Sequence, residues 1–421
     1  GGVWWDPKDQ LFKMWYEAGW LNKMAYATSN DGVNWVRPDL NNGSNELLTL
    51  SRFPANSCAV VLDYEASDNE RYKMFLRSPN ANATDNAGYC MISSNGKQWS
   101  WFTKTGPCGD RSTMFYNPFR KKWVFSIRTL GVLGNSPHGR ARYYREHSDF
   151  LTGAVWTKAD VVFWCNADNK DTPDPEFNLP PELYNLNAVG YESIMLGFFS
   201  VWQGPENDVC ASDNVIKRNQ IMVGYSRDGY SWFREDMNPF HAVNTTASDA
   251  WNQGNLQSVA GAPLIVGDKL YFYLSGRRLR GTQEITTTGL AMLRRDGFAS
   301  MKGTGELQTS LLKFDGSYFF VNANVAGEMK VELLDSDNKV IEGFSKDDCK
   351  VFKGDNVKAR IEWTGNTSLA SLKDKQIKVR FYIDNGEIFA FWISPSMNGE
   401  SMGYTAGGGP GLNISGIDKN N

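Results

Sequence analysis

Short apolar segments alternate with polar turns from the start of the chain to residue 302, and the same arrangement returns five times. Each copy contains two β-hairpins whose strands are rich in aromatic and β-branched residues and whose turns contain Asp, Asn and Gly. The first copy pairs GGVWW and LFKMWYEA with KMAYATS, the turn NDG and VNWVRP. Four strands in each of five copies predict an all-β fold, with a five-bladed β-propeller over residues 1–302. The copies occupy residues 1–50, 51–105, 106–175, 176–245 and 246–302.

Three of the turns share a serine, an Asp or Asn, a glycine and a tryptophan. They read SNDGVNW, SSNGKQW and SRDGYSW, and are similar to shortened Asp-box turns. Gly, Asn and Asp tolerate the positive φ that tight hairpins need, and Asp side chains bond to their own turns. We therefore expect Asp31 and Asp228 to stabilise turns and not to catalyse. Asp6, in the turn WWDPKDQ, is expected to do the same.

The pattern changes after Met301. Residues 303–397 contain many short strands separated by turns such as Asp315-Gly316, and every second residue is apolar in VKARIEW and QIKVRFYI. Such alternation is typical of half-buried strands and predicts a β-sandwich that follows the propeller. The remaining residues, 398–421, are rich in Gly and Asn and predict an extended or mobile tail.

Composition excludes several classes of protein. Aromatic residues make up 13% of the chain and the formal net charge is −3, which does not fit a disordered protein. The sequence has no basic cluster to indicate a nucleic-acid partner and no apolar run of about 18 residues to span a membrane. The six cysteines are scattered without a CxxC pair, so no metal or cofactor is predicted, and disulfide pairing stays open.

Carboxylates at the axial mouth are the candidate catalytic groups. In a propeller, the residues just before each innermost strand open on one mouth, together with the loops that join second and third strands. Cleavage of a glycosidic bond needs two carboxyl groups, of which Asp110 is the best placed and Glu182 a plausible partner. Glu192 is the other candidate general acid. If Tyr191-Glu192-Ser193 is a tight turn, Glu192 lies at the far end of its strand; otherwise it enters the channel wall.

Other polar and aromatic side chains are expected at the same mouth. Guanidinium groups grip carboxylates, sulfates and phosphates in pairs of hydrogen bonds, so converging arginines suit an anionic sugar. Amides suit sugar hydroxyls, and tryptophan rings stack on sugar rings. Trp20 and His138 also fall in loops near the mouth. The predicted substrate-binding residues are Arg111, Arg140, Tyr184, Asn185, Asn187, Trp251, Gln257 and Arg277.

Several stretches resemble a known group of enzymes. KMWY followed by YATSNDGVNW, together with GDRSTMFYNPFRKKWVFSIR and WNQGNLQSVAGAPLIVGDKLYFYLSGR, is similar to the propeller glycosidases of glycoside hydrolase families 32 and 43 and to family-32-like proteins of polysaccharide-degrading bacteria. The resemblance implies a funnel-shaped sugar site on the propeller axis and a C-terminal β-sandwich. The invertase signatures Asn-Asp-Pro-Asn-Gly, Arg-Asp-Pro and Glu-Cys are absent, so no catalytic residue is carried over.

The resulting expectation is a glycosidase that removes a terminal sugar, anionic or neutral, from a plant or algal polysaccharide. Asp110 would act as nucleophile, general base or a carboxylate that tunes its neighbours, with Glu182 or Glu192 as general acid. The implied location is periplasmic or extracellular, although the chain opens at Gly1 without a signal peptide. The alternative is a non-catalytic carbohydrate-binding propeller, because the predicted mouth holds more amides than carboxylates. The oligomeric state stays open.

Overall fold

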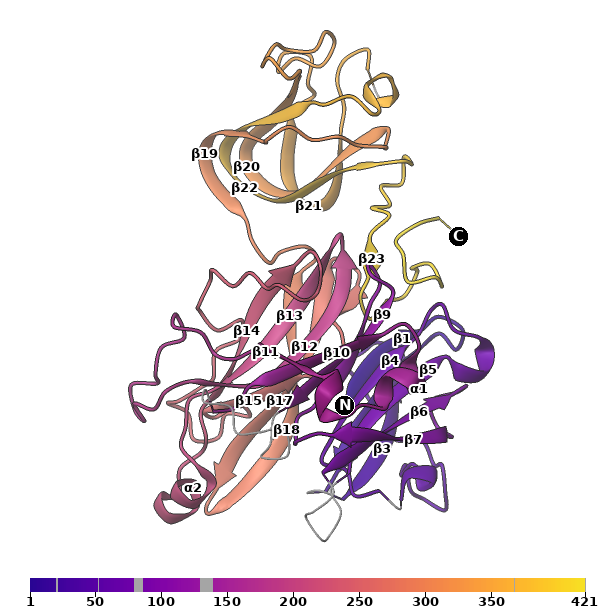
Figure 1. The fold of residues 1–421 in the computed structure, drawn as a ribbon. Coiled ribbons are helices and arrows are strands. Elements are labelled where there is room, and N and C mark those ends of the chain that lie inside the picture. Colours follow the sequence, from indigo (N-terminus) through magenta and orange to yellow (C-terminus); the bar gives the residue numbers. More distant parts are fainter. Residues whose placement is uncertain (20–21, 52, 79–85, 129–138, 367, 421) are drawn as a thin grey trace. The chain divides into compact units, whose positions relative to one another are not determined.

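In the computed structural model the chain consists mostly of antiparallel β-strands (Figure 1). The structure describes residues 1–19, 22–51, 53–78, 86–128, 139–366 and 368–420. Two compact units are present: unit 1 comprises residues 1–265, 271–291 and 404–416, and unit 2 comprises residues 266–270, 292–403 and 417–421. Within the described ranges, no helix is both long and apolar enough to cross a membrane.

Unit 1 is a succession of β-sheets in the order of the sequence repeats. The first sheet contains β1 (Gly2–Asp6), β2 (Leu11–Ala18) and β3 (Lys23–Ser29). The second contains β4 (Ser57–Leu62), β5 (Tyr72–Arg77), β6 (Ala87–Ser93) and β7 (Ser100–Pro107). The third contains β8 (Thr113–Asn117), β9 (Lys122–Arg128), β10 (Arg142–His147) and β11 (Val162–Cys165).

The last two repeats join in one larger sheet. Its order is β16-β17-β15-β14-β13-β12-β23, with β18 paired to β17. The strands are β12 (Glu182–Glu192), β13 (Ile194–Trp202), β14 (Asn219–Ser226), β15 (Asn255–Val259), β16 (Leu264–Val266), β17 (Lys269–Arg280), β18 (Gln283–Arg294) and β23 (Tyr404–Thr405). The helices are short: α1 (Phe150–Ala154), α2 (Asn207–Asp213), η1 (Leu48–Leu50), η2 (Asp68–Glu70), η3 (Lys158–Asp160) and η4 (Ala370–Leu372).

The first strands of the repeats lie beside one another. β1 contacts β4, β4 contacts β8, β8 contacts β12 and β12 contacts β15. The loop after β15 then returns to β1, because a Cβ atom on Gly261 would lie 2.7 Å from the backbone nitrogen of Val3. The five first strands therefore form a closed series, and their starting ends share one face of unit 1.

The fourth strand is incomplete in two repeats. After β3, only the isolated bridges Thr28–Val36 and Ala25–Glu46 are formed, and after β14 only Tyr225–Phe233 and Ile221–His241. The segments concerned, VRPDLNNGSN and REDMNPFHAVN, contain Pro, Asp and Asn. Proline lacks the N–H that a continuous ladder needs, and Asp and Asn favour turns, so the expected outer strands are reduced to bridges.

The three Asp-box turns have the predicted structural role. The Asp31 carboxylate accepts hydrogen bonds from the backbone nitrogens of Val33 and Asn34 at 2.8 and 2.7 Å. Asp228 accepts from the two equivalent nitrogens of its own turn, at 2.8 Å each. The Asn95 side chain does the same at 2.8 and 3.0 Å. The side-chain oxygens of these three residues accept hydrogen bonds within their own turns, which indicates a structural and not a catalytic role.

Each Asp-box turn is also bonded to the repeat that precedes it around the series. Trp15 Nε1 in the first repeat donates to the Gly96 carbonyl of the second repeat at 2.6 Å. Asn117 Nδ2 in the third repeat donates to the Asp228 carbonyl of the fourth at 2.8 Å. The Tyr273 hydroxyl in the fifth repeat donates to the Gly32 carbonyl of the first.

The Gly/Asn-rich tail is not a separate mobile region. Residues 404–416 belong to unit 1, and β23 pairs with the end of β12. The Gly407 carbonyl accepts from the Trp5 nitrogen, and the Gly408 carbonyl accepts from the Ile265 nitrogen, both at 2.9 Å. The tail is ordered because it satisfies backbone groups at the edges of β1 and β16 that would otherwise be unpaired. This corrects the expectation for residues 398–421.

Unit 2 begins near residue 292, before the predicted boundary at 303. It has one four-stranded antiparallel sheet in the order β19-β22-β20-β21, and not two separate sheets. Its strands are β19 (Met301–Gln308), β20 (Tyr318–Leu334), β21 (Phe352–Ile361) and β22 (Lys378–Ser394). The β20–β22 register shifts between Val325 and Met329. Such irregularities let a long strand bend over a core, so one sheet covers what two sheets were expected to enclose.

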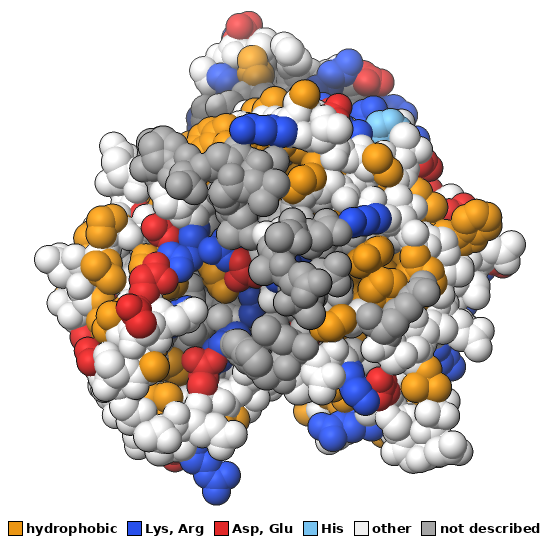
Figure 2. All heavy atoms as spheres, turned by 60° about the horizontal axis from the view of Figure 1, so that its bottom comes forward, with side chains coloured by type: hydrophobic (Ala, Val, Ile, Leu, Met, Phe, Trp, Pro, Cys, Tyr) orange, Lys and Arg blue, Asp and Glu red, His pale blue; other side chains and the backbone are white. Residues whose placement is uncertain are grey.

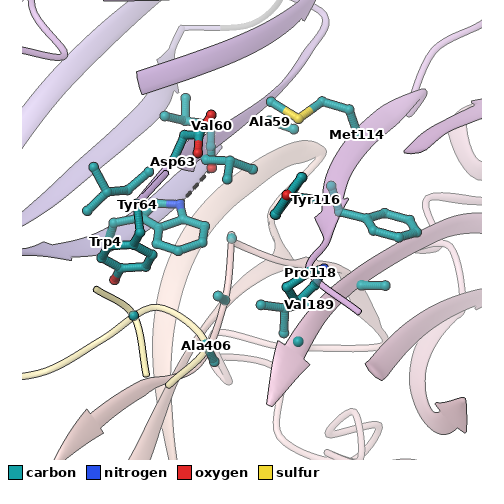
Figure 3. Close-up of a pocket in the computed structure, with 18 of the residues that line it drawn as sticks. Trp4, Ala59, Val60, Asp63, Tyr64, Met114, Tyr116, Pro118, Val189 and Ala406 are labelled. Carbon is teal, nitrogen blue, oxygen red and sulfur yellow. Dashed lines mark hydrogen bonds between the residues drawn. The ribbon is translucent and has the colours of Figure 1, made fainter. Parts of the chain in front are cut away.

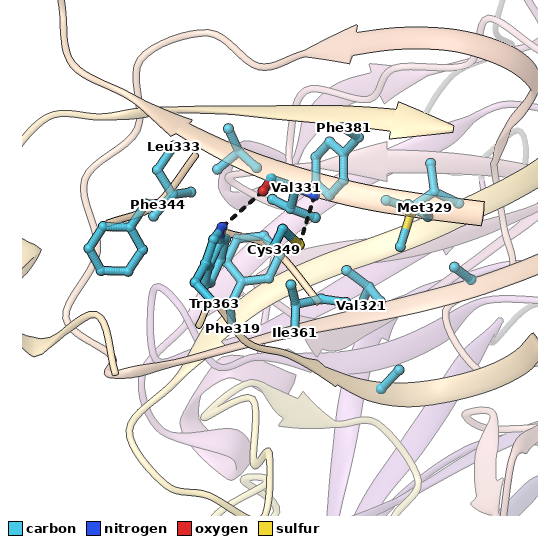
Figure 4. Close-up of a cluster of buried hydrophobic side chains, with 14 of the residues drawn as sticks. Phe319, Val321, Met329, Val331, Leu333, Phe344, Cys349, Ile361, Trp363 and Phe381 are labelled. Carbon is cyan, nitrogen blue, oxygen red and sulfur yellow. Dashed lines mark hydrogen bonds between the residues drawn. The ribbon is translucent and has the colours of Figure 1, made fainter. Parts of the chain in front are cut away.

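The core of unit 2 is a cluster of buried aromatic and aliphatic side chains (Figure 4). Trp363 lies at its centre, 1% exposed, with its indole nitrogen bonded to the Val331 carbonyl at 2.9 Å. The Val331 nitrogen donates to the Cys349 sulfur at 3.2 Å. Cys349 therefore acts as a buried hydrogen-bond acceptor, and all six cysteines are free.

Candidate functional site

A tyrosine and an aspartate meet where two first strands begin. The β12–β13 ladder shifts between Leu183 and Asn185, so Tyr184 is an extra residue in β12 with no partner in β13. A bulge of this kind re-aims a side chain, and it is common near active sites. The Tyr184 hydroxyl donates to Asp110 Oδ2 at 3.1 Å. Asp110 comes from the turn just before β8, so the contact brings the residues before β8 next to the start of β12.

Guanidinium groups surround this pair. Arg128, at the end of β9, forms an ion pair with Asp110. Its guanidinium carbon lies 5.4 Å from the centre of the Tyr184 ring, and that of Arg111 lies 6.0 Å from it. The Arg111 backbone has φ of 57°, a left-handed conformation that is costly for a residue with a side chain and is often found at functional sites.

Gln257 joins two of the predicted arginines. It is the extra residue of a second bulge, since the β15–β17 register shifts between Leu256 and Ser258. Its Oε1 accepts hydrogen bonds from Arg111 Nη2 and, at 2.6 Å, from Arg277 Nη2. Arg277 also forms an ion pair with Glu284. Residues from the third and fifth repeats are thus connected through one amide oxygen.

Glu182 lies at the same end of β12 as Tyr184, two residues before it. It pairs with Arg140, which also reaches Glu206 at 2.9 Å and lies over the Trp202 ring at 4.2 Å. Gly139 leaves room for this arrangement, because a Cβ atom there would lie 2.0 Å from Glu182 Oε1. The structure therefore brings both predicted carboxylates, Asp110 and Glu182, to one end of the first strands.

Arg142 holds the backbone of this site in place. Its side chain is completely buried. It donates to the Arg111 carbonyl at 2.9 Å, to the Tyr184 carbonyl at 3.2 Å and to Ser126. Burial lowers the pKa of the Arg142 guanidinium to about 9. Arg142 fixes both residues whose side chains face the mouth and contacts no substrate itself, so it is a positioning residue.

The charges at the mouth shift the acidity of its members. Burial acts to raise the pKa of Tyr184, but the positive charges of Arg111 and Arg128 outweigh it, so that the pKa of the phenol lies below its ordinary value. Burial, together with the neighbouring charge of Arg111, lowers the pKa of Arg277. The phenol therefore ionises more readily here than it would in water.

One predicted catalytic residue lies elsewhere. Tyr191 pairs with Ile194, so the turn between β12 and β13 is tight, and Glu192 has φ of 49° within it. Ten residues of extended strand, roughly 33 Å, separate Glu192 from Glu182. Glu192 cannot act together with the mouth carboxylates, which corrects the expectation that it could serve as general acid.

The remaining predicted residues differ in their roles. Asn187 is about 10 Å farther along the strand than Tyr184 and bonds the Val259 carbonyl at 3.0 Å, linking β12 to β15. Asn185 is buried, and its amide oxygen has no hydrogen-bond partner in the described part of the chain. Trp251 packs on the backbone of Gly276 and Gly289 and is therefore a packing residue and not a free stacking platform. Trp20 and His138 lie outside the described residues.

A separate apolar cavity lies farther along the first strands, away from the mouth (Figure 3). Residues 59–62 of β4 and 187–190 of β12 line it, with Trp4, Tyr64 and Met114. Trp4 Nε1 donates to the Val60 carbonyl at 2.6 Å. Its lining is mainly hydrocarbon and aromatic, and it also includes the carboxyl groups of Asp63 and Glu65, which follow β4. Burial raises the pKa of Asp63. Among the described residues that line the cavity there is no arginine, in contrast to the surroundings of Asp110 and Glu182.

Figure 2 shows a hollowed face on which basic and acidic side chains lie close together. No group of three or more His, Cys, Asp or Glu side chains that could hold a metal ion occurs in the described ranges. The described side chains of the mouth are arginines, the carboxylates Asp110, Glu182, Glu206 and Glu284, a phenol and amides. Such a set can grip an anion, move protons and bind hydroxyls.

Sequence reasoning missed Arg128 and Glu284, and it expected Arg142 only as one of several loop residues at the mouth. Arg128 and Arg142 end or begin apolar strands, in KWVFSIR and RYYREH. An arginine at the end of an otherwise apolar second strand was the available signal, since Arg77 and Arg128 end β5 and β9. Glu284 follows the turn after β17, and the register of the β17–β18 hairpin, which the sequence does not show, brings it to Arg277.

No family model matches the chain, and no curated protein matches it in sequence. Among solved structures, it is similar to an N-acetylgalactosamine deacetylase from F. plautii in complex with blood group B trisaccharide, with 12% identity, a TM-score of 0.49 and coverage of 67% of this chain and 85% of that chain. It is similar to a fructofuranosidase from Schwanniomyces occidentalis (10% identity, TM-score 0.41, 93% of each chain). It is also similar to an exo-beta-1,3-galactanase from Phanerochaete chrysosporium (11% identity, TM-score 0.40, 92% of this chain and 94% of that chain).

At these identities, the function has to be inferred from the residues of this chain.

Proposed function

We propose that the protein is a glycoside hydrolase that acts on a terminal, anionic sugar of a plant or algal polysaccharide. The observation that carries the proposal is the convergence of Asp110, Glu182 and Tyr184 with arginines at the shared starting ends of the first strands. The closed series of these strands supports a five-bladed β-propeller with its substrate site on the axis, and the curved sheet of unit 2 supports a β-sandwich-like second domain.

In this proposal Glu182 and Asp110 have different catalytic roles. Glu182 gives a proton to the glycosidic oxygen as the bond to the anomeric carbon breaks. Asp110 acts on the opposite side, as nucleophile or as the base that takes a proton from the attacking water. The products are the released sugar and the shortened chain with a free hydroxyl group. Arg128 and Arg140 hold the two carboxylates in position.

The experiment is a screen of purified protein against plant and algal polysaccharides, with released sugars identified by chromatography. Release of one monosaccharide is the expected result. Asp110→Asn and Glu182→Gln should each reduce the rate by about a hundredfold or more. Glu192→Gln makes the same change of carboxylate to amide at the far end of β12 and should leave the rate near that of the unaltered protein. Full activity of either mouth variant would refute the assigned role.

A second candidate function is a carbohydrate-binding propeller without hydrolysis. It is favoured by one observation: both mouth carboxylates are already paired with guanidinium groups, an arrangement that serves binding as well as catalysis. Oligosaccharide binding by calorimetry with no sugar released would support it. A polysaccharide substrate is met outside the cytoplasm, so we also propose a periplasmic or extracellular location, which fractionation of the producing cells would test.

A further inference from the structure

Within the described ranges, some arginines at the mouth form ion pairs with carboxylates, whereas Arg111 does not. Arg128 and Arg140 each face carboxylates, as described above. Arg111 is partly buried and forms no ion pair with a carboxylate in the described part of the chain, although the charge of Glu17 acts on it from beyond ion-pair distance. Its Nη2 instead donates to the neutral amide oxygen of Gln257.

This amide oxygen stands between two positive charges. Arg277 Nη2 donates to the same Gln257 Oε1 at 2.6 Å. The two nitrogens are therefore within about 6 Å of each other, twice the length of an ordinary hydrogen bond. Arg277 has Glu284 as a carboxylate partner. The two guanidinium groups therefore converge on an oxygen that carries only a partial negative charge.

We infer that Arg111 and Arg277 form a subsite for a singly charged oxyanion on the sugar, a carboxylate or a sulfate ester, at the position that Gln257 Oε1 marks. The inference rests on the proposed function, since the oxyanion belongs to the sugar that is released. Guanidinium groups match such oxyanions with paired, charge-assisted hydrogen bonds. Because Glu284 already balances part of the positive charge, the subsite fits a monoanion better than a phosphate monoester, which carries nearly two negative charges at neutral pH.

The subsite lies beside the proposed catalytic groups. Arg111 faces the Tyr184 ring, and the Tyr184 hydroxyl bonds Asp110. An oxyanion held there places its sugar ring next to Asp110, while Arg142 fixes the backbone of Arg111. Recognition of the charge and attack on the anomeric centre are thereby coupled through neighbouring side chains.

The test is calorimetric titration of the full chain with defined probes: glucuronate, galacturonate, glucose 6-sulfate, glucose 6-phosphate, inorganic sulfate and neutral glucose. A monoanionic sugar should bind about tenfold or more tightly than glucose. Preference for a uronate identifies a carboxylate, and preference for glucose 6-sulfate identifies a sulfate ester. Equal binding of all sugars, or tightest binding of glucose 6-phosphate, would overturn the inference.

Two variants make the test specific. Gln257→Glu supplies a fixed carboxylate at the marked position, so it should abolish the preference for anionic sugars and raise the thermal unfolding midpoint. Gln98→Glu adds the same charge on an exposed turn and should change neither. Arg111→Met should weaken anion binding about tenfold or more, whereas Arg120→Met, whose side chain pairs with Glu146, should not. Unaltered anion binding by Gln257→Glu would overturn the subsite.

The subsite and the proposed function can fail separately. Hydrolysis of a neutral glycoside without any preference for anionic sugars would overturn the subsite and keep the hydrolase. Tight binding of a uronate or sulfated sugar, lost in Gln257→Glu, without release of sugar from any polysaccharide would keep the subsite and overturn the hydrolase.

Discussion

The hydroxyl of Tyr184 donates a hydrogen bond of 3.1 Å to the carboxylate of Asp110, at the ends of two neighbouring first strands. This hydrogen bond joins two residues that are 74 positions apart in the sequence. The positive charges of Arg111 and Arg128 lie on either side of it and set the acidity of the phenol.

Ionisation of Tyr184 can be observed directly. Because the neighbouring charges hold its pKa below the ordinary value of about 10, the tyrosinate absorbance of the folded protein should begin to rise at lower pH than in Tyr184→Phe. An ultraviolet titration between pH 7 and 11 measures this. Tyr116→Phe is the control, since burial raises the pKa of Tyr116 and its loss should not remove the earliest rise. Identical early titration in Tyr184→Phe and the unaltered protein would contradict the assignment.

Asp6 should be essential for stability. It is completely buried and bonds Lys13 at 2.6 Å and Arg71 at 2.5 Å, and it also accepts from the Tyr72 hydroxyl. Asp6→Asn leaves the buried Lys13 with only one of its two carboxylate partners, Asp9, and leaves Arg71 without its carboxylate. The free energy of unfolding should therefore fall by about 3 kcal/mol. Urea unfolding at pH 7 measures the loss.

The pH dependence of Asp6 gives a second check. Burial opposes ionisation of Asp6, but hydrogen bonds from Arg71 and Lys13 dominate and lower its pKa. A carboxyl whose pKa is lower in the folded state stabilises above its unfolded value of about 3.9 and loses that contribution as pH falls. The difference between the unaltered protein and Asp6→Asn should stay constant from pH 5 to 8 and shrink below about pH 4. Asp68→Asn removes an exposed, solvent-screened pair with Lys8 and should leave the free energy of unfolding nearly unchanged.

The bond between Tyr273 and Gly32 joins the fifth repeat to the first. Tyr273→Phe keeps the ring and removes the hydroxyl, leaving a buried carbonyl without its donor, so unfolding should become easier by about 0.5–1.5 kcal/mol. Tyr271→Phe is a matched change on the same strand, because the Tyr271 hydroxyl makes no hydrogen bond within the described ranges. Equal losses in the two variants, measured by thermal unfolding, would show that the Gly32 bond contributes nothing.

Gly139 should be required for the position of Glu182. An alanine there would collide with Glu182 Oε1 and would also have to adopt φ of 68°. Gly281 has a similar φ of 63° with open space around it. Gly281→Ala should therefore cost about 1–2 kcal/mol, which is the backbone cost alone. Gly139→Ala should cost more and also reduce sugar release or binding at the mouth. Equal stability and unaltered activity in both variants would argue against the collision.

The repeat pattern predicted the hairpins because period-two alternation and Asp-Gly turns are local properties of the chain. The same locality explains the success at Asp31 and Asp228, whose partners lie within three residues. It also placed Asp110, Arg111 and Glu182 at the mouth, because each comes just before, or at the start of, a first strand.

Bulges account for part of what the sequence could not show. Tyr184 and Gln257 are extra residues in β12 and β15, and nothing in their neighbours marks the shift. The sequence pattern predicted Asn187 and Tyr184 alike as substrate-binding residues. In the structure Tyr184 faces Asp110, whereas Asn187 lies farther along β12 and bonds the Val259 carbonyl. The roles of Arg128 and Arg142 depend on contacts with other repeats, and the ordering of residues 404–416 depends on unpaired strand edges hundreds of residues away.

Those same tail residues impose an order on biosynthesis. The Trp5 nitrogen donates to Gly407 and the Ile265 nitrogen to Gly408, so the hydrogen bonding of β1 is completed only by residues that leave the ribosome long after it. The residues of unit 2 between 292 and 403 are synthesised before that closure can occur. A nascent chain interrupted before residue 404 would expose the edges of β1 and β16, where chaperones or a second nascent chain could pair with them.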